Sequence, residues 1–130
     1  MINIVIGKPG SGKTYHMVRY LYEVLVELLK KENQERKIYT NIAVNIDEFN
    51  RQLSEHFKTQ VDVSQILIIL DSQFLQYDPK LIANEDRLEK RVAGRSYYSV
   101  KATSKAFFWN RFDDNALILI DEIQRYLLLY

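Results

Sequence analysis

The amino-terminal part of the chain changes from one hydrophobic pattern to another. Residues 2–6 read Ile-Asn-Ile-Val-Ile, a β-branched apolar run typical of a strand buried on both faces. From Thr14 to about Lys31 no Gly or Pro occurs, and apolar residues recur at helical spacing, namely Val18, Leu21, Leu25, Leu28 and Leu29. On the polar face, Glu27 and Lys31 are spaced for an ion pair. The pattern predicts a strand, a short connection and a helix.

Further apolar runs predict more elements of the same kind. Residues 38–42 and 66–70 have the length and composition of strands. Between them, Asn45 followed by Glu48 is typical of a helix start, and three apolar residues then share one helical face, namely Phe49, Leu53 and Phe57. A strand, a crossover helix and a second strand form a right-handed βαβ unit. The fold class is therefore α/β with a mostly parallel sheet flanked by helices.

Residues 71–100 have weaker patterns. We expect a loop, a polar helical turn or two within residues 85–95, and a strand near residues 97–100. Residues 104–112 favour a short helix carrying Phe107, Phe108 and Trp109, which we interpret as core rather than as a base-stacking platform. The long stretch 71–100, with its weak pattern, suggests a mobile or functional insertion.

Composition narrows the function classes. At 130 residues the chain is one domain, and its net charge of +1 gives no argument for nucleic acid or a membrane surface. The absence of cysteine rules out disulfides and thiolate metal sites, and His16 and His56 lack metal-ligand spacing. No apolar run approaches the roughly 20 residues that span a bilayer, so we expect a soluble chain.

The connection between the first strand and the first helix carries the strongest chemical signal. It reads Gly7-Lys8-Pro9-Gly10-Ser11-Gly12-Lys13-Thr14, which fits the phosphate-binding pattern G-x-x-x-x-G-K-[ST]. Glycines let several amide N–H groups converge on one anion, and the helix that follows adds its dipole. Lys13 would reach the β- and γ-phosphates of ATP and the Thr14 hydroxyl would bind Mg²⁺. Tyr15 completes the candidate nucleotide-binding set.

A second constellation lies near the carboxyl terminus. Residues 116–120 form an apolar strand that ends in Asp121 and Glu122, as in a Walker B motif. Asp121 would hold Mg²⁺, and Glu122 would act as general base on the attacking water. Asp71, which also ends an apolar run but has no following glutamate, is the rival magnesium ligand. After Glu122, four apolar residues predict a helix that packs on the sheet, namely Ile123, Tyr126, Leu127 and Tyr130.

Taken together, four segments resemble the amino-terminal domain of the zonula occludens toxin (Zot) family. They are the phosphate loop, Thr40-Asn41 after the second strand, the aromatic segment 107–109, and Asp121-Glu122 at the end of an apolar strand. The family includes assembly ATPases of filamentous phages. The resemblance implies an ATPase that drives virion assembly and export from the cytoplasmic face of the bacterial inner membrane.

The resemblance also implies features outside this chain. The full-length protein would be membrane-anchored, would form a homo-oligomeric ring and would contact phage assembly proteins, so we expect this chain to be a fragment. In a RecA-like sheet, a strand from beyond Tyr130 would lie between the phosphate-loop strand and the Walker B strand. Arg91, Arg95 and Arg111 are candidates for an arginine acting in trans, although each is typical of a solvated surface residue. Asn41 is a candidate switch that would hold Glu122 away from water, or else a turn residue.

Two other functions fit the same phosphate loop. One is a small-molecule kinase, in which the charged segment 85–95 would form a lid. The other is a non-catalytic module that binds nucleotide weakly. The pair Asp121-Glu122 favours water as the phosphate acceptor, and therefore an ATPase.

Overall fold

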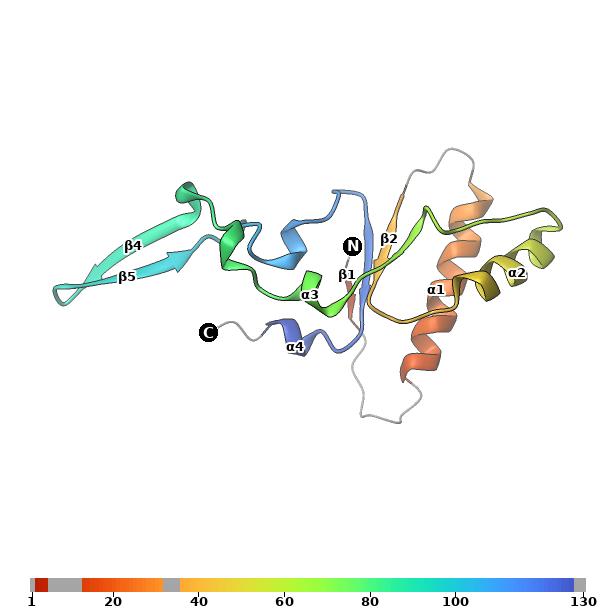
Figure 1. The fold of residues 1–130 in the computed structure, drawn as a ribbon, viewed down its shortest axis with the longest axis horizontal. Coiled ribbons are helices and arrows are strands. Elements are labelled where there is room, and N and C mark those ends of the chain that lie inside the picture. Colours follow the sequence, from red (N-terminus) through yellow and green to blue (C-terminus); the bar gives the residue numbers. More distant parts are fainter. Residues whose placement is uncertain (1, 5–12, 32–35, 128–130) are drawn as a thin grey trace. The chain divides into compact units, whose positions relative to one another are not determined.

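The computed structural model describes residues 2–4, 13–31 and 36–127 (Figure 1). The chain divides into two compact units, one of residues 1–70 and 115–125 and the other of residues 71–114 and 126–130. The first unit contains a parallel sheet flanked by helices, which confirms the α/β class. In the part of the chain that the structure describes, no helix is long and apolar enough to cross a membrane.

The sheet of the first unit has four parallel strands in the order β1-β6-β2-β3. Their bounds are β1 Ile2–Ile4, β2 Ile38–Thr40, β3 Leu67–Ile69 and β6 Leu117–Ile120. The sequence predicted all four, each slightly longer. All four residues of β6 are buried, as expected of a continuous apolar run in a parallel sheet.

One expectation about this sheet is wrong. The family resemblance implied a strand between the phosphate-loop strand and the Walker B strand, but β1 pairs directly with β6, with Ile4 beside Ile120. On its other side β6 pairs with β2, with Leu119 beside Thr40. Both edges of β6 are therefore hydrogen-bonded to strands of this chain, and the described sheet has no room for a strand between β1 and β6.

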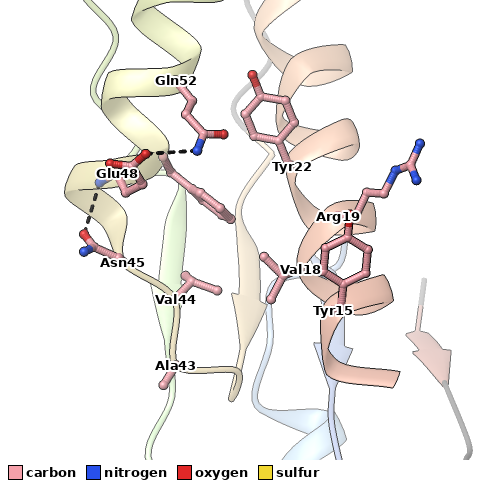
Figure 2. A pocket seen from close by; sticks show the side chains of 10 residues that line it. Tyr15, Val18, Arg19, Tyr22, Ala43, Val44, Asn45, Glu48 and Gln52 are labelled. Atoms are coloured by element: carbon pink, nitrogen blue, oxygen red, sulfur yellow. Dashed lines mark hydrogen bonds between the residues drawn. The ribbon is translucent and has the colours of Figure 1, made fainter. Parts of the chain in front are cut away.

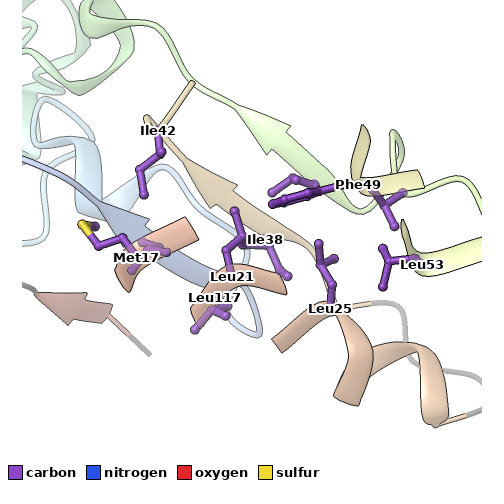
Figure 3. Close-up of a cluster of buried hydrophobic side chains, with 11 residues drawn as sticks. Met17, Leu21, Leu25, Ile38, Ile42, Phe49, Leu53 and Leu117 are labelled. Atoms are coloured by element: carbon purple, nitrogen blue, oxygen red, sulfur yellow. The ribbon is translucent and has the colours of Figure 1, made fainter. Parts of the chain in front are cut away.

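Two helices pack on the sheet through a shared apolar cluster (Figure 3). Helix α1 spans Lys13–Lys30 and helix α2 spans Ile46–Phe57. The predicted cap of α2 is present, since the backbone N–H of Glu48 donates to Asn45 Oδ1 at 3.0 Å. The cluster contains Met17, which the helical pattern did not single out, besides Leu21, Leu25, Phe49 and Leu53. Glu27 pairs with Lys30 rather than with Lys31, because α1 ends at Lys30.

The second unit is built largely from short elements. In chain order they are α3 Ser72–Leu75, the 3-10 turns Pro79–Leu81 and Asn84–Asp86, β4 Arg87–Val92, β5 Arg95–Val100 and the 3-10 turn Phe108–Asn110. The predicted helical turns within 85–95 are confirmed only at Glu85 and Asp86, which lie in the 3-10 turn Asn84–Asp86. Residues 87–92 form β4 instead, because Ala93 and Gly94 both adopt positive φ, +55° and +79°, and close a tight hairpin with β5.

Only one residue of the aromatic segment 107–109 forms core, because Phe108 is buried whereas Phe107 and Trp109 are half-buried and stack on each other with ring centroids 4.8 Å apart. The expected helix over 104–112 shrinks to the 3-10 turn Phe108–Asn110, and Phe108 is 2% exposed. Its ring meets those of Trp109, Phe112 and Tyr126 edge-on, with centroids 5.3, 6.4 and 6.3 Å away. The interpretation of Phe108 as core is therefore confirmed.

Arg111 holds this unit together through backbone carbonyls. Its guanidinium donates to four carbonyl oxygens at 2.6–3.2 Å, those of Phe74, Gln76, Lys105 and Ala106. It also lies 5.6 Å from the centroid of the Phe74 ring. Arg111 is therefore half-buried and engaged within its own unit rather than a solvated surface residue.

We predict that Arg111→Lys lowers the free energy of unfolding by about 2–4 kcal/mol, because a single ammonium cannot replace a planar fork that donates to four carbonyls. Urea unfolding measures this. Arg91→Lys, on the exposed hairpin, is the matched control and should stay within about 0.5 kcal/mol of the parent. Equal stability of the two variants would contradict the role of Arg111.

Candidate functional site

The carboxyl ends of β1 and β6 lie at the same level of the sheet. Ile4 is the last residue of β1 and Ile120 the last of β6, and the two are register partners. Ligands of open α/β sheets bind at this edge. The chain leaves β1 toward the phosphate-loop segment and leaves β6 into Asp121. The strands that precede the two candidate motifs in sequence are therefore neighbours in the sheet.

Much of the phosphate-binding motif lies outside the described residues. This holds for the segment Gly7-Lys8-Pro9-Gly10-Ser11-Gly12 and for the side chains of Lys13 and Thr14. The structure does describe the backbone of the last two residues, which begins α1 as the motif requires of a loop that opens a helix. The roles assigned to these residues stay predictions.

Asn41 joins β2 to the residue after β6. Its side-chain Nδ2 donates to the backbone oxygen of Asp121 at 2.9 Å, and its Oδ1 accepts from the Asp121 backbone N–H at 2.7 Å. A carboxamide has the same donor and acceptor as a peptide group. The Asn41 side chain therefore continues the β2–β6 ladder one step beyond the last register pair, Thr40 with Leu119. This Asn41–Asp121 clamp fixes where the half-buried Asp121 lies.

The backbone changes direction immediately after the clamp. Glu122 has φ +56°, the left-handed region that residues with a Cβ rarely adopt. Its carbonyl accepts from the Arg125 N–H at 3.0 Å and so starts helix α4, Gln124–Leu127. The predicted helix after Glu122 is thus confirmed over four residues. Residues other than glycine rarely adopt positive φ by themselves, so the surrounding turn holds Glu122 in this conformation. The turn therefore sets the direction of the Glu122 side chain.

The carboxamide of Asn41 is engaged with the backbone of Asp121, the residue before Glu122. The switch role of Asn41 stays a prediction. The sequence singled out Asn41 because it ends a strand, but its partner 80 positions away could be found only from the strand order β6-β2.

The rival magnesium ligand is engaged in local structure. The carboxylate of Asp71 caps α3 by accepting from the Phe74 N–H at 3.0 Å. The strand before it, β3, is separated from β1 by both β2 and β6. Asp121, which follows the strand beside β1, is the better placed carboxylate.

A groove of about 430 Å³ runs between α1 and the segment leading into α2 (Figure 2). Tyr15 lines one side of it from the first turn of α1 and is 66% exposed. Phe49 and Tyr22 line it further along, with rings edge-on at 6.0 Å. Glu48 lies on its rim, and bonds from Arg51 and Gln52 lower the pKa of this carboxyl to about 2. The groove is mostly apolar and begins two residues after Lys13.

The types of donor expected at this site suit magnesium, and magnesium binding stays a prediction. Within the described ranges no three His, Asp or Glu side chains gather into a metal site. Mg²⁺ commonly binds one or two protein oxygens and completes its shell with water and substrate phosphates. One carboxylate at Asp121 and one hydroxyl at Thr14 suit that mode of binding, rather than an all-protein cage.

We predict that Asn41→Ala lowers the free energy of unfolding by about 1–3 kcal/mol, because a part-buried peptide group loses both partners. Asn50→Ala is the control, since Asn50 also makes two side-chain bonds, to Val63 and Asp62. Backbone NMR signals of Asp121 and Glu122 should shift only in Asn41→Ala. Unchanged signals at both residues would contradict the clamp.

We also predict that Glu122→Gly raises the free energy of unfolding by about 1 kcal/mol, because glycine adopts positive φ without the Cβ penalty. Ala93→Gly, at φ +55°, is the matched control and should gain a similar amount. Thermal unfolding measures both. A loss at Glu122 beside a gain at Ala93 would show that the Glu122 side chain stabilises this turn.

Comparison with known proteins gives one family. The sequence model of the family described as zonular occludens toxin (Zot) matches residues 1–127. No curated protein and no solved structure matches the chain. The match covers nearly the whole sequence, including both candidate motifs and Asn41, and the chain belongs to the Zot family.

Proposed function

We propose that this chain is the ATP-binding and ATP-hydrolysing domain of a Zot-like protein that drives filamentous phage assembly and export. The observation that carries the proposal is the register of β1 with β6, since the strands that precede the phosphate-loop segment and Asp121 in sequence are neighbours in the sheet. Family membership and the complete G-x-x-x-x-G-K-T motif support it.

The residues at the candidate site would bind ATP and magnesium and position them for hydrolysis. Gly7 to Thr14, followed by Tyr15, would hold the triphosphate of ATP, with Lys13 on its β- and γ-phosphates. Bound Mg²⁺ would neutralise charge on the phosphates. Asp121 and Thr14 would hold the ion, and the Asn41–Asp121 clamp would fix the strand end that carries the carboxylate. Catalysis of this kind depends mainly on positioning and charge stabilisation.

Glu122 would orient the attacking water and accept its proton. Its backbone conformation supports this role, because an energetically costly φ at a strand end is typical of residues held for function. In a ring, a neighbouring subunit would supply an arginine. Since Arg111 is engaged within its own unit, Arg91 and Arg95 on the exposed hairpin are the remaining candidates of the original three.

We predict that Lys13→Ala abolishes ATP binding, and that Glu122→Gln binds ATP but hydrolyses it about 100-fold more slowly or worse, since a positioned base contributes that much. Calorimetry with ATP and Mg²⁺ and a phosphate-release assay measure the two effects. Equal hydrolysis by Glu122→Gln and the parent would refute the role of the glutamate.

Three further measurements test the choice of metal ligand and the two alternative functions. Asp121→Asn should lose magnesium-dependent binding while Asp71→Asn keeps it, and the opposite result would reassign the metal ligand. Phosphate transfer to an added acceptor with little free phosphate would favour a kinase. ATP binding without turnover by the parent chain would favour a non-catalytic module.

A further inference from the structure

The hairpin β4–β5 is exposed on both faces. Every residue of β4 and all but the last residue of β5 are exposed. The exposed fractions are 60% for Val92, 53% for Tyr97 and 73% for Tyr98. A two-stranded hairpin with both faces in water is marginally stable by itself. Large apolar side chains on such an element indicate a surface that meets a partner.

The register of the hairpin separates its side chains into two faces. Directly opposed residues share a face, and Lys90 opposes Tyr97 while Val92 opposes Arg95. One face therefore carries Leu88, Lys90, Val92, Arg95, Tyr97 and Ser99, all described in the structure, and this set contains two cations and no carboxylate. We call this set the basic–aromatic face.

The other face carries the remaining charges. Arg87, Glu89 and Arg91 alternate along β4, and Glu89 opposes Tyr98. The strands together hold four cations and one carboxylate, although the whole chain has a net charge of only +1. The positive charge is concentrated on the hairpin, so the net charge of the whole chain does not show it. A local positive field attracts an anionic partner.

We propose that the basic–aromatic face binds single-stranded nucleic acid. Lys90 and Arg95 would contact phosphates, and Tyr97 would stack on an unpaired base. Stacking needs an exposed ring beside cations that contact the phosphates. Tyr97 lies directly across from Lys90 and two residues from Arg95 on the same strand, so it neighbours both cations on one face. Exposed tyrosines on the two faces suit unpaired bases better than a closed duplex, whose bases are already stacked.

The test uses the 130-residue chain and a fluorescent oligothymidylate of about 20 nucleotides, with anisotropy read between about 50 and 200 mM salt. The double variant Lys90→Ser/Arg95→Ser should bind about tenfold or more weakly, with a salt slope shallower by about 1.4, or about 0.7 per lost phosphate contact. Tyr97→Ala should weaken binding about fivefold or more, as for a lost stacking partner.

Three control variants test whether a loss of binding is specific to the basic–aromatic face. Lys31→Ser removes an exposed cation and Tyr20→Ala an exposed tyrosine from the first unit, and both should bind as the parent does. Lys13→Ala should also bind the oligonucleotide normally. A normal result for Lys13→Ala separates this proposal from the ATP site, so that either can fail alone.

Several outcomes would overturn the proposal. One is no binding by the parent, or equal affinity and salt slope for the double variant. Another is binding to vesicles containing phosphatidylserine, lost in the double variant and not competed by the oligonucleotide, which would make the partner a membrane. Tighter binding to a duplex of the same length would exclude the single-stranded mode. Self-association that the double variant abolishes, without oligonucleotide binding, would make the partner a second copy.

Discussion

The arrangement of the candidate site depends on two hydrogen bonds from one side chain. Asn41 bonds both backbone polar groups of Asp121 and so extends the ladder between β2 and β6 beyond the strands themselves. Strand ends are otherwise where a sheet frays, because the next peptide group has no partner. The clamp removes that freedom at the position that carries the acidic pair. Glu122, next in the chain, follows the clamp at positive φ.

The clamp works because of the strand order. Strand β6 lies between β1 and β2, so its end is flanked by the end of β1 on one side and by Asn41 on the other. Three segments far apart in sequence therefore meet at one edge. The apolar face of α1, with Met17, Leu21 and Leu25, packs on the same sheet. Burial of these side chains ties the helix that follows the phosphate loop to the strands that carry the acids.

The sequence predicted what depends on local periodicity. The strands, α1, the cap at Asn45 and the core position of Phe108 follow from patterns within a few residues of each other. It failed where the deciding partner is distant. The alternating charges of residues 87–92 favour a polar helix until they pair with residues 95–100. Arg111 resembles any surface arginine until four carbonyls converge on it.

The distinction between local patterns and distant partners applies to the functional residues too. The phosphate-binding pattern is contiguous, so the sequence shows it even where the structure leaves residues 5–12 undescribed. The Asn41–Asp121 clamp and the basic–aromatic face are assembled by strand pairing, so no contiguous sequence motif predicts them. The face in particular depends on register, because a shift by one residue would move Lys90 and Val92 to the opposite side of the hairpin. Since both turn residues have positive φ, the tight turn at Ala93 and Gly94 fixes that register, and with it the side on which charge and aromatic surface coincide.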